Sequence, residues 1–520
     1  MNTTVSRSWE NSAENSILSS TQGEAAMQAV NLAELLHNAA ERTPQKPAVT
    51  CGEQTVSYET LDRSTDALAR WLIHQGSKPG DRVTLHWPNS IEMVTLLFGC
   101  FKAGLIAVPV NVRLKAPEVA YILAHSKPAI CFAHPDLIGA SREAYGGLAS
   151  HQKLQPSATD LPFSSERLEL PTINEDDPAL ILYTSGTTAR PKGVTHTHRT
   201  LLEGAKIVCA DTMDGVQTVL IMSQMAYITA FSVGLAAVNA GDTSVLVPAF
   251  DAPLVLDTIE RFQCTYTFGL PSMVQLLVEE QTRKPRQVSS LRTFLSGGDA
   301  VPESLQQRFR ALFGVPLREI FGMTEIGPGM LNPADAIRSG SLGKPFDRVE
   351  VRVVDGSCKD VADGEIGELA VRSPASFVGY WDHPAATQEA FRDGWLYTGD
   401  FARRDADGYL WFAGRKKEII VRDGINIAPQ EVEEALYRHP AVLEVGVIGL
   451  PDPVRARGEQ VVAFVSLRHG MVADQKDLME CALRHLADFK VPQRIVFADS
   501  LPKGITGKVQ RRALKQASLM

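Results

Sequence analysis

The sequence has few cysteines, no excess of positive charge and no long uninterrupted apolar run. Its seven cysteines are scattered, odd in number and free of CxxC or Cys/His spacing. This pattern favours reduced thiols in a cytoplasmic protein over a disulfide framework or a zinc site. The formal net charge of -8 argues against a nucleic-acid partner.

Signals for a membrane or for secretion are also lacking. The most apolar region, 94–110, is interrupted by Lys102, Gly104 and Pro109, which indicates a buried helix followed by a strand rather than a transmembrane span. Residues 1–30 are polar and lack the basic start and apolar run of a signal peptide. We expect them to form a disordered tail.

What is present favours a large α/β protein. The chain has 520 residues, of which 44% are hydrophobic and 22% charged, as in ordinary globular proteins. From Asn31 to about residue 412, helical stretches alternate with short apolar strands, for example at 82–85, 129–132 and 218–221. This alternation predicts layered helices and mostly parallel sheets. Between 349 and 371 the pattern changes to strands joined by Asp-Gly turns, which predicts a small antiparallel β subdomain.

A second, smaller domain is expected after Gly414. Its pattern predicts an α+β unit with strands at 418–421, 442–449 and 460–466 and helices at 429–439 and 474–486. The predicted domains are therefore a tail at 1–30, a large domain at 31–413 and a small mobile domain at 414–520. The polar stretch that begins at Gly414 is the expected hinge.

A loop of hydroxyl and glycine residues follows the apolar strand expected at 179–182, and a helix is expected from about Thr197. Backbone N–H groups and hydroxyls in such a loop can surround phosphate oxygens, and Arg190 and Lys192 add positive charge. The alternative is an ordinary surface turn. It is not a Walker A loop, because no second glycine precedes Lys192 and no Ser or Thr follows it. The candidate phosphate-binding residues are Thr184, Ser185, Gly186, Thr187, Thr188 and Lys192.

Four further motifs follow this loop along the chain. They lie at 295–300, 319–325, 394–400 and 501–508. In this order the five motifs resemble those of the adenylate-forming superfamily, which comprises acyl-CoA synthetases, aryl-CoA ligases, luciferases and peptide-synthetase adenylation domains. The resemblance covers nearly the whole chain from Asn31. Ala189 departs from it, since the family usually has glycine there and alanine disfavours positive φ.

The resemblance implies roles for residues of the second and third motifs. Gly297, Gly298 and Asp299 would form a wall of the adenine and acyl pockets, although a plain strand-to-helix turn is the alternative. Phe321 stands where the family usually has Tyr and can stack on adenine beside Gly322. Thr324 would bond the α-phosphate. With Thr184, Glu325 would hold Mg²⁺ against the triphosphate, although Thr-Glu alone is also a common helix cap.

The remaining implied roles fall in the last part of the chain. Asp400 would accept both ribose hydroxyls, and Arg415 would help to grip ribose and phosphate. Lys417 occupies the family's hinge position, and Lys508 matches its adenylation lysine. His198 matches a histidine common after the phosphate loop, for which both a catalytic and a structural role are open.

The implied reaction consumes ATP, with Mg²⁺, and a carboxylic acid to give acyl-AMP and pyrophosphate; coenzyme A then accepts the acyl group. Loading of an acyl carrier protein and a non-catalytic nucleotide-binding relative are the alternatives, and a homodimer is left open. The candidate pocket residues carry no formal charge, which predicts a fatty or aryl monocarboxylate. They are Met225, Tyr227, Phe231, Gly297, Gly298, Gly322, Met323 and Gly327.

Overall fold

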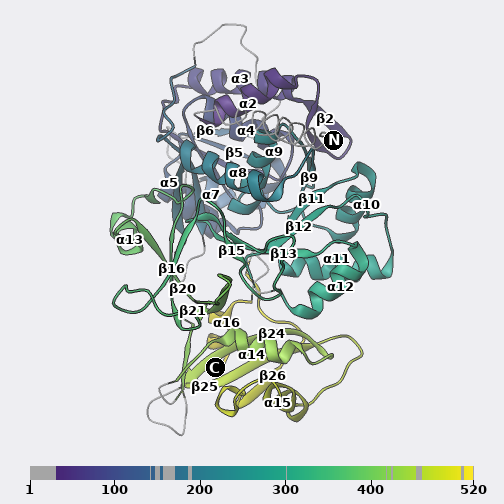
Figure 1. Cartoon of the computed structure of the whole chain (residues 1–520). Coiled ribbons are helices and arrows are strands. Elements are labelled where there is room, and N and C mark those ends of the chain that lie inside the picture. Colours follow the sequence, from purple (N-terminus) through teal and green to yellow (C-terminus); the bar gives the residue numbers. More distant parts are fainter. Residues whose placement is uncertain are drawn as a thin grey trace, which may run out of the picture. The chain divides into compact units, whose positions relative to one another are not determined.

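The computed structural model describes residues 31–140, 142–146, 153–155, 170–184, 190–299, 301–416, 418–422, 425–451, 459–504 and 509–518. The expected tail, the centre of the phosphate loop at 185–189, Lys417 and Lys508 lie outside these residues. The chain forms two compact units, and Figure 1 labels their elements. The first comprises residues up to Val112, Ala116–Leu182 and Thr195–Ala249, and the second comprises Arg113–Lys115, Tyr183–Val194 and Phe250–Met520.

Parallel strands form the centre of the first unit. Strand β3 (Arg82–His86) pairs in parallel with β4 (Ile106–Pro109) and β5 (Ile130–Ala133), and β9 (Thr218–Ile221) pairs in parallel with β10 (Thr243–Leu246). These strands are short apolar runs because parallel strands are buried on both faces. The prediction of mostly parallel sheets is confirmed here.

The region that the sequence predicted as a buried helix and strand is α4 (Ile91–Lys102) followed by β4. Helix α4 begins where the Ser90 side chain accepts a hydrogen bond from the Met93 N–H at 3.1 Å. Most of its side chains are buried, and the turn at Gly104 has φ of +68°. Within the part of the chain that the structure describes, no helix combines the length and apolar content needed to cross a membrane.

The other elements of the first unit cover or extend these strands. The helices are α2 (Leu32–Arg42), α3 (Tyr58–His74), α5 (Ala116–Ser126), α6 (Pro135–Ala140), α7 (Arg142–Gly146), α8 (His198–Thr212) and α9 (Ile228–Ala240). The strands are β1 (Pro47–Cys51), β2 (Gln54–Ser57), β6 (Lys153–Gln155), β7 (Pro178–Thr184) and β8 (Lys192–Thr197), of which β7 and β8 run into the second unit.

The second unit begins with an α/β arrangement of the same kind. Strands β11 (Tyr266–Gly269), β12 (Thr293–Gly297) and β13 (Leu317–Met323) pair in parallel, and β14 (Gly327–Leu331) turns back against β13. The edge strand β15 (Lys344–Pro345) pairs with β14. The helices of this part are α10 (Ala252–Phe262), α11 (Pro271–Arg283) and α12 (Glu303–Phe313).

An antiparallel sheet confirms the predicted β subdomain and extends it to Arg415. It pairs β16 (Glu350–Val354), β17 (Ile366–Arg372), β20 (Trp395–Arg404), β21 (Leu410–Arg415) and β19 (Phe391–Arg392). Strand β18 (Gly379–Tyr380) and helix α13 (Pro384–Ala390) lie between β17 and β19 along the chain.

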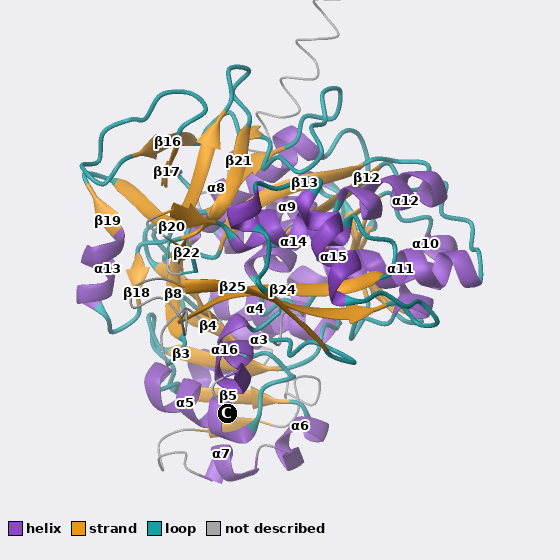
Figure 2. Ribbon diagram, turned by 90° about the horizontal axis from the view of Figure 1, so that it is seen from below, coloured by secondary structure: helices purple, strands orange, loops and turns teal. Residues whose placement is uncertain are grey.

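The C-terminal residues form the expected α+β module. Strand β24 (Val442–Pro451) pairs antiparallel with β25 (Glu459–Leu467), and α14 (Pro429–Tyr437) and α15 (Gln475–Leu483) accompany them (Figure 2). Apolar side chains from these elements make one buried cluster that includes Val432, Leu436 and Val461. The remaining elements are β22 (Ile420–Arg422), β23 (Ile425–Ile427), a 3₁₀ turn at Asp488–Lys490, β26 (Arg494–Phe497) and α16 (Arg511–Ser518).

Candidate active site

The phosphate loop is bounded by two strands rather than by a strand and a helix. Strand β7 ends at Thr184, and β8 runs from Lys192 to Thr197 before α8 begins. Thr197 caps α8 by accepting from the Thr200 N–H at 3.2 Å. Of the candidate phosphate ligands, Thr184 and Lys192 are therefore described, and both belong to the second unit.

Lys192 and Glu325 meet at one tyrosine that the sequence reasoning missed. The Lys192 ammonium lies 4.6 Å from the centroid of the Tyr380 ring. The Tyr380 hydroxyl donates a hydrogen bond to Glu325 Oε1 at 3.0 Å. The Trp381 N–H donates to the Gly193 carbonyl at 2.7 Å, which ties the two chain segments together beside the ring. In the sequence, Tyr380 appears only as one of two aromatic residues after Gly379. No charged or catalytic residue beside it pointed to a role in the site.

Glu325 lies at the tip of the β13–β14 hairpin. The turn is closed by the Ile326 N–H, which donates to the Met323 carbonyl at 3.2 Å. The Phe377 N–H donates to the Glu325 carbonyl at 2.8 Å. The alternative that Thr-Glu merely caps a helix is therefore wrong. Burial raises the pKa of the Glu325 carboxyl, while the Tyr380 hydrogen bond and the charges of Lys192 and Arg415 oppose this rise.

The side chains of Glu325 and Thr184 have the chemistry to hold Mg²⁺ together with the phosphates of a nucleotide. Among the described residues there is no group of three or more His, Cys, Asp or Glu side chains arranged to hold a metal. Mg²⁺ is commonly held by one or two carboxylates together with substrate phosphates. Glu325 and the Thr184 hydroxyl are oxygen donors of the kind that this arrangement requires.

Asp400 and Arg415 form a second polar pair in the same unit. They face each other in the register of β20 and β21, and Arg415 Nε lies 3.3 Å from Asp400 Oδ1. Asp400 is only 5% exposed, and its N–H donates to Thr398 Oγ1 at 3.1 Å. Gly399 has φ of +75° at an irregularity of the strand, a backbone geometry that favours glycine. The predicted glycine turn is thus a distortion within β20 that fixes the carboxylate.

The predicted glycine wall divides into two kinds of residue. A Cβ on Gly297 would lie 1.9 Å from the Ile320 carbonyl oxygen, so close packing of β12 on β13 already requires glycine there. A Cβ on Gly322 would likewise lie 2.5 Å from the Gly327 carbonyl oxygen. Gly298 and Asp299, by contrast, are exposed beyond the end of β12. Packing between strands is therefore a sufficient reason for Gly297 and Gly322.

Four site candidates lie in the first unit, namely His198, Phe231, Tyr227 and Met225, of which Met225 is buried. His198 is fully buried, its Nδ1 accepts from the Leu32 N–H at 3.3 Å, and burial lowers its pKa to about 4. This burial favours the structural alternative over the catalytic one. Phe231 is also buried and packs edge-on against Phe101 at 6.1 Å. Tyr227 is half-buried, and its hydroxyl accepts from Asn111 Nδ2 at 2.5 Å.

The residues on either side of Lys508 are firmly anchored. Lys503 and Val509 form an antiparallel bridge, and the Gln510 N–H donates to the Pro502 carbonyl at 2.8 Å. Arg511 binds Glu433 through two hydrogen bonds of 2.8 Å and Glu418 through one of 2.9 Å.

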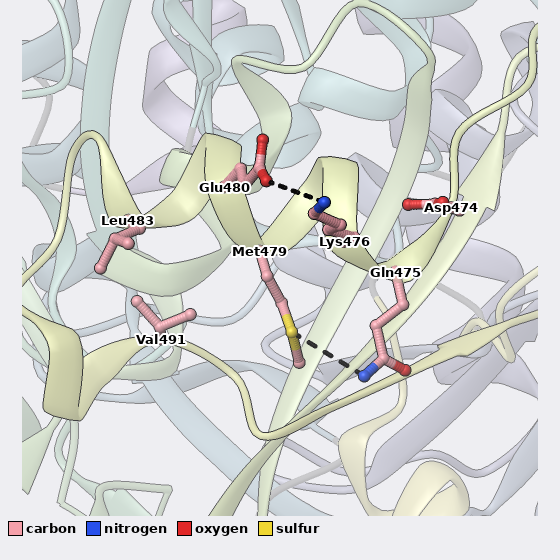
Figure 3. A pocket seen from close by; sticks show the side chains of 7 residues that line it. All are labelled: Asp474, Gln475, Lys476, Met479, Glu480, Leu483 and Val491. Atoms are coloured by element: carbon pink, nitrogen blue, oxygen red, sulfur yellow. Dashed lines mark hydrogen bonds and ion pairs between the residues drawn. The ribbon is translucent and has the colours of Figure 1, made fainter.

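A separate hollow lies along α15 in the C-terminal module (Figure 3). The side chains that line it include Lys476 and Glu480, which are 3.9 Å apart, and the apolar Met479. None of the predicted site residues lines this hollow.

Comparisons with known proteins find relatives over most of the chain. The family model described as AMP-binding enzyme matches residues 36–381, and the model described as AMP-binding enzyme C-terminal domain matches residues 431–508. A fatty acid–[acyl-carrier-protein] ligase from Streptomyces coeruleorubidus is 34% identical over 502 residues, covering 92% of this chain and 94% of the relative. A feruloyl-CoA synthase from Amycolatopsis sp. is 35% identical over 482 residues, covering 92% of this chain and 97% of the relative.

Solved structures show the same architecture. The anthranilate CoA ligase AuaEII in complex with anthranoyl-AMP superposes with a TM-score of 0.88 at 28% identity, covering 95% of this chain and 99% of that one. The family models span most of the chain and include the Lys192 and Glu325 positions, whereas Asp400 and Arg415 fall between the two matches. The chain belongs to the AMP-binding enzyme family, the adenylate-forming superfamily of acyl- and aryl-CoA ligases.

Proposed function

We propose that this chain is an AMP-forming acyl-CoA ligase that acts on a hydrophobic monocarboxylic acid. The observation that carries the proposal is the joining of Lys192 to Glu325 through Tyr380, which brings a cation and an oxygen ligand to one place beside the phosphate loop. Curated relatives named as CoA ligases support the same acid–thiol ligase activity.

The chemistry has two half-reactions. In the first, the substrate carboxylate attacks the α-phosphorus of ATP; the bond to pyrophosphate breaks, and acyl-AMP remains. In the second, the thiolate of coenzyme A attacks the acyl carbonyl, and AMP leaves with the electron pair of the broken bond. The first step depends mainly on positioning and on neutralising charge, because carboxylate and triphosphate repel each other.

The described residues divide this task among them. Lys192 neutralises phosphate charge, and Glu325 with Thr184 would hold Mg²⁺, which when bound screens the triphosphate. Asp400 accepts from the ribose hydroxyls, and Arg415 keeps that carboxylate oriented. We assign Ser185, Gly186, Thr187 and Thr188 to the phosphates, and Thr324, Phe321 and Asp299 to the rest of the nucleotide.

The domain arrangement is part of the proposal. Residues 31–413 would bind ATP and the acid, and residues 414–520 would be a mobile lid that carries Lys508 and turns about Lys417. The anchoring of Arg511 supports such a lid, because it fixes the start of α16 to the rest of the module. Lys508 would then act in adenylation and withdraw before thioester formation.

The acid is proposed to be apolar because the candidate pocket side chains carry no formal charge. A second carboxylate or an ammonium group there would be buried without a partner. Relatives named for fatty acids and for ferulate support this class, whereas a relative of 34% identity is named for sulfoacetate, a charged acid. Medium- or long-chain fatty acids are ranked slightly ahead of aryl acids.

A carrier protein is the second candidate acceptor, because one of the relatives reported above is named as a ligase for an acyl carrier protein. The two acceptors share the phosphopantetheine thiol, so the first half-reaction is the same. A cytoplasmic location and a homodimer are further hypotheses; fractionation and light scattering would test them.

The test is pyrophosphate release with acetate, malonate, benzoate, ferulate, octanoate and palmitate, compared by kcat/KM. Each acid is assayed alone, with coenzyme A and with a phosphopantetheinylated carrier protein. We expect release that depends on octanoate, palmitate or an aryl acid, and thioester with coenzyme A. A preference for malonate or acetate would contradict the substrate class, and thioester on the carrier alone would favour the second acceptor.

Two controls separate the nucleotide site from the acid pocket. Asp400→Asn should weaken ATP use with every acid to the same extent, because Asp400 is assigned to ribose. Gly298→Leu adds bulk at the end of β12 and should selectively reduce use of the longer acids; because Gly298 has φ of +86°, which favours glycine over leucine, the melting temperature of the variant is measured as well. If the unaltered protein releases no pyrophosphate with any of these acids, the proposed activity is wrong and the non-catalytic alternative is favoured.

A further inference from the structure

Tyr380 touches both charged side chains of the candidate site. Its hydroxyl donates to Glu325 Oε1 at 3.0 Å, and the Lys192 ammonium lies 4.6 Å from the centre of its ring. A hydrogen bond to a charged acceptor is stronger than one between neutral groups. A cation over an aromatic face is attracted by the ring quadrupole. A single side chain therefore contacts the candidate phosphate ligand and the candidate metal ligand at once.

The backbone around Tyr380 is held on both sides. Its own N–H donates to Thr387 Oγ1 at 2.9 Å, and the next N–H, of Trp381, donates to the Gly193 carbonyl at 2.7 Å. The Phe377 ring packs against the Tyr380 ring with centroids 4.9 Å apart. The ring position is thus set by the fold and does not depend on Glu325 or Lys192.

The same segment also fixes the backbone of its two partners. Phe377 N–H holds the Glu325 carbonyl at 2.8 Å, and Trp381 N–H holds the residue next to Lys192. Residues 377–381, which we call the clamp segment, therefore join the β13–β14 hairpin tip to the arm of the phosphate loop. Their two backbone bonds set the distance between these elements, and Tyr380 sets the direction of the side chains.

We infer that Tyr380 is a positioning residue for nucleotide binding, which orients Glu325 toward the metal and Lys192 toward the phosphates. The inference rests on the proposed function. Holding both groups in place before ATP arrives removes an ordering cost from binding.

Equilibrium binding without turnover tests the inference. The affinity for ATP is measured by calorimetry in the absence of the acid, once with Mg²⁺ and once with a chelator. Tyr380→Phe keeps the ring and its packing but removes the hydrogen bond to Glu325. We expect it to weaken Mg·ATP binding about 10-fold and metal-free ATP binding less than about 2-fold.

A second variant separates the two contacts. Tyr380→Leu also removes the ring beneath Lys192, so it should weaken metal-free ATP binding several-fold as well. Tyr409 provides a matched control: its ring lies 4.1 Å from the Arg338 guanidinium, and its hydroxyl donates to the Ala336 carbonyl at 2.5 Å. Tyr409→Phe should leave both affinities for ATP unchanged.

A double-mutant cycle shows whether Tyr380 acts through Glu325. In a Glu325→Ala background, Tyr380→Phe should change Mg·ATP affinity less than about 2-fold, because its acceptor is gone. Equal losses in both backgrounds, or a Tyr380→Phe protein that binds Mg·ATP normally, would overturn the inference. If the unaltered protein itself bound no ATP, the proposed function would fail, and the inference with it.

Discussion

A buried carboxyl beside the candidate site should make stability depend on pH. Glu319 lies on β13 and is only 8% exposed. Its Oε1 accepts from Gln306 Nε2 at 2.5 Å and from the Gly340 N–H at 2.8 Å. Burial raises its pKa from 4.5 to about 7, and the two hydrogen bonds only partly oppose the rise.

The sign follows from comparing the folded and unfolded states. The pKa is higher in the folded protein, so the unfolded protein loses its proton first as the pH rises. The contribution of Glu319 to the free energy of unfolding is therefore full below pH 4.5, falls between pH 4.5 and pH 7, and is constant above pH 7. With 1.36 kcal/mol per pKa unit, the loss between pH 5 and pH 8 is about 2.5 kcal/mol.

Glu319→Gln should remove this loss. The glutamine carbonyl can accept both hydrogen bonds but carries no charge, so the variant should gain about 2.5 kcal/mol over the unaltered protein on going from pH 5 to pH 8. Urea unfolding followed by tryptophan fluorescence at the two pH values measures this difference. The matched control is Glu303→Gln, which changes a solvent-exposed glutamate on α12. This substitution should change the free energy of unfolding by the same amount at both pH values. A pH-independent difference for Glu319→Gln, or one of opposite sign, would refute the reasoning.

Four further outcomes are expected. Lys508→Ala should abolish acid-dependent pyrophosphate release yet still convert a supplied acyl-adenylate to thioester; equal loss of both steps in a folded variant would show that the assignment is wrong. Lys417→Pro should spare adenylation and reduce thioester formation by orders of magnitude, because proline fixes φ; normal thioester formation from supplied adenylate would contradict the hinge. Arg511→Met should lower the melting temperature and slow adenylation, since it leaves two half-buried carboxylates, of Glu418 and Glu433, without their cation; an unchanged melting temperature would argue against this. Gly297→Ala should cost about 3 kcal/mol, the upper end of the usual cost of overpacking, because its Cβ would lie 1.9 Å from the Ile320 oxygen; normal stability with altered acid preference would instead support a pocket wall.

The sequence alone determined the elements and the family. Apolar runs such as 82–85 and 218–221 became parallel strands because burial on both faces demands continuous apolar residues. The C-terminal pattern gave helices and strands close to their observed bounds, for example α14 and β24. Motif order also pointed to Lys192, Glu325 and Asp400 as candidate nucleotide ligands, since their chemistry is visible in the residue types themselves, and these assignments stay predictions.

Tertiary structure alone decided which of these residues meet and through what. Tyr380 carries no motif chemistry of its own, and it becomes significant only because residues 325 and 380, far apart along the chain, share a hydrogen bond. For His198 the sequence left a catalytic and a structural role open, and neither its burial nor its hydrogen bond from the Leu32 N–H could be read from its neighbours. Gly297 looked like room for a ligand, whereas the Ile320 carbonyl of the next strand already requires that glycine. Local pattern fixes helices, strands and charges, while burial and contact depend on segments that the fold brings together.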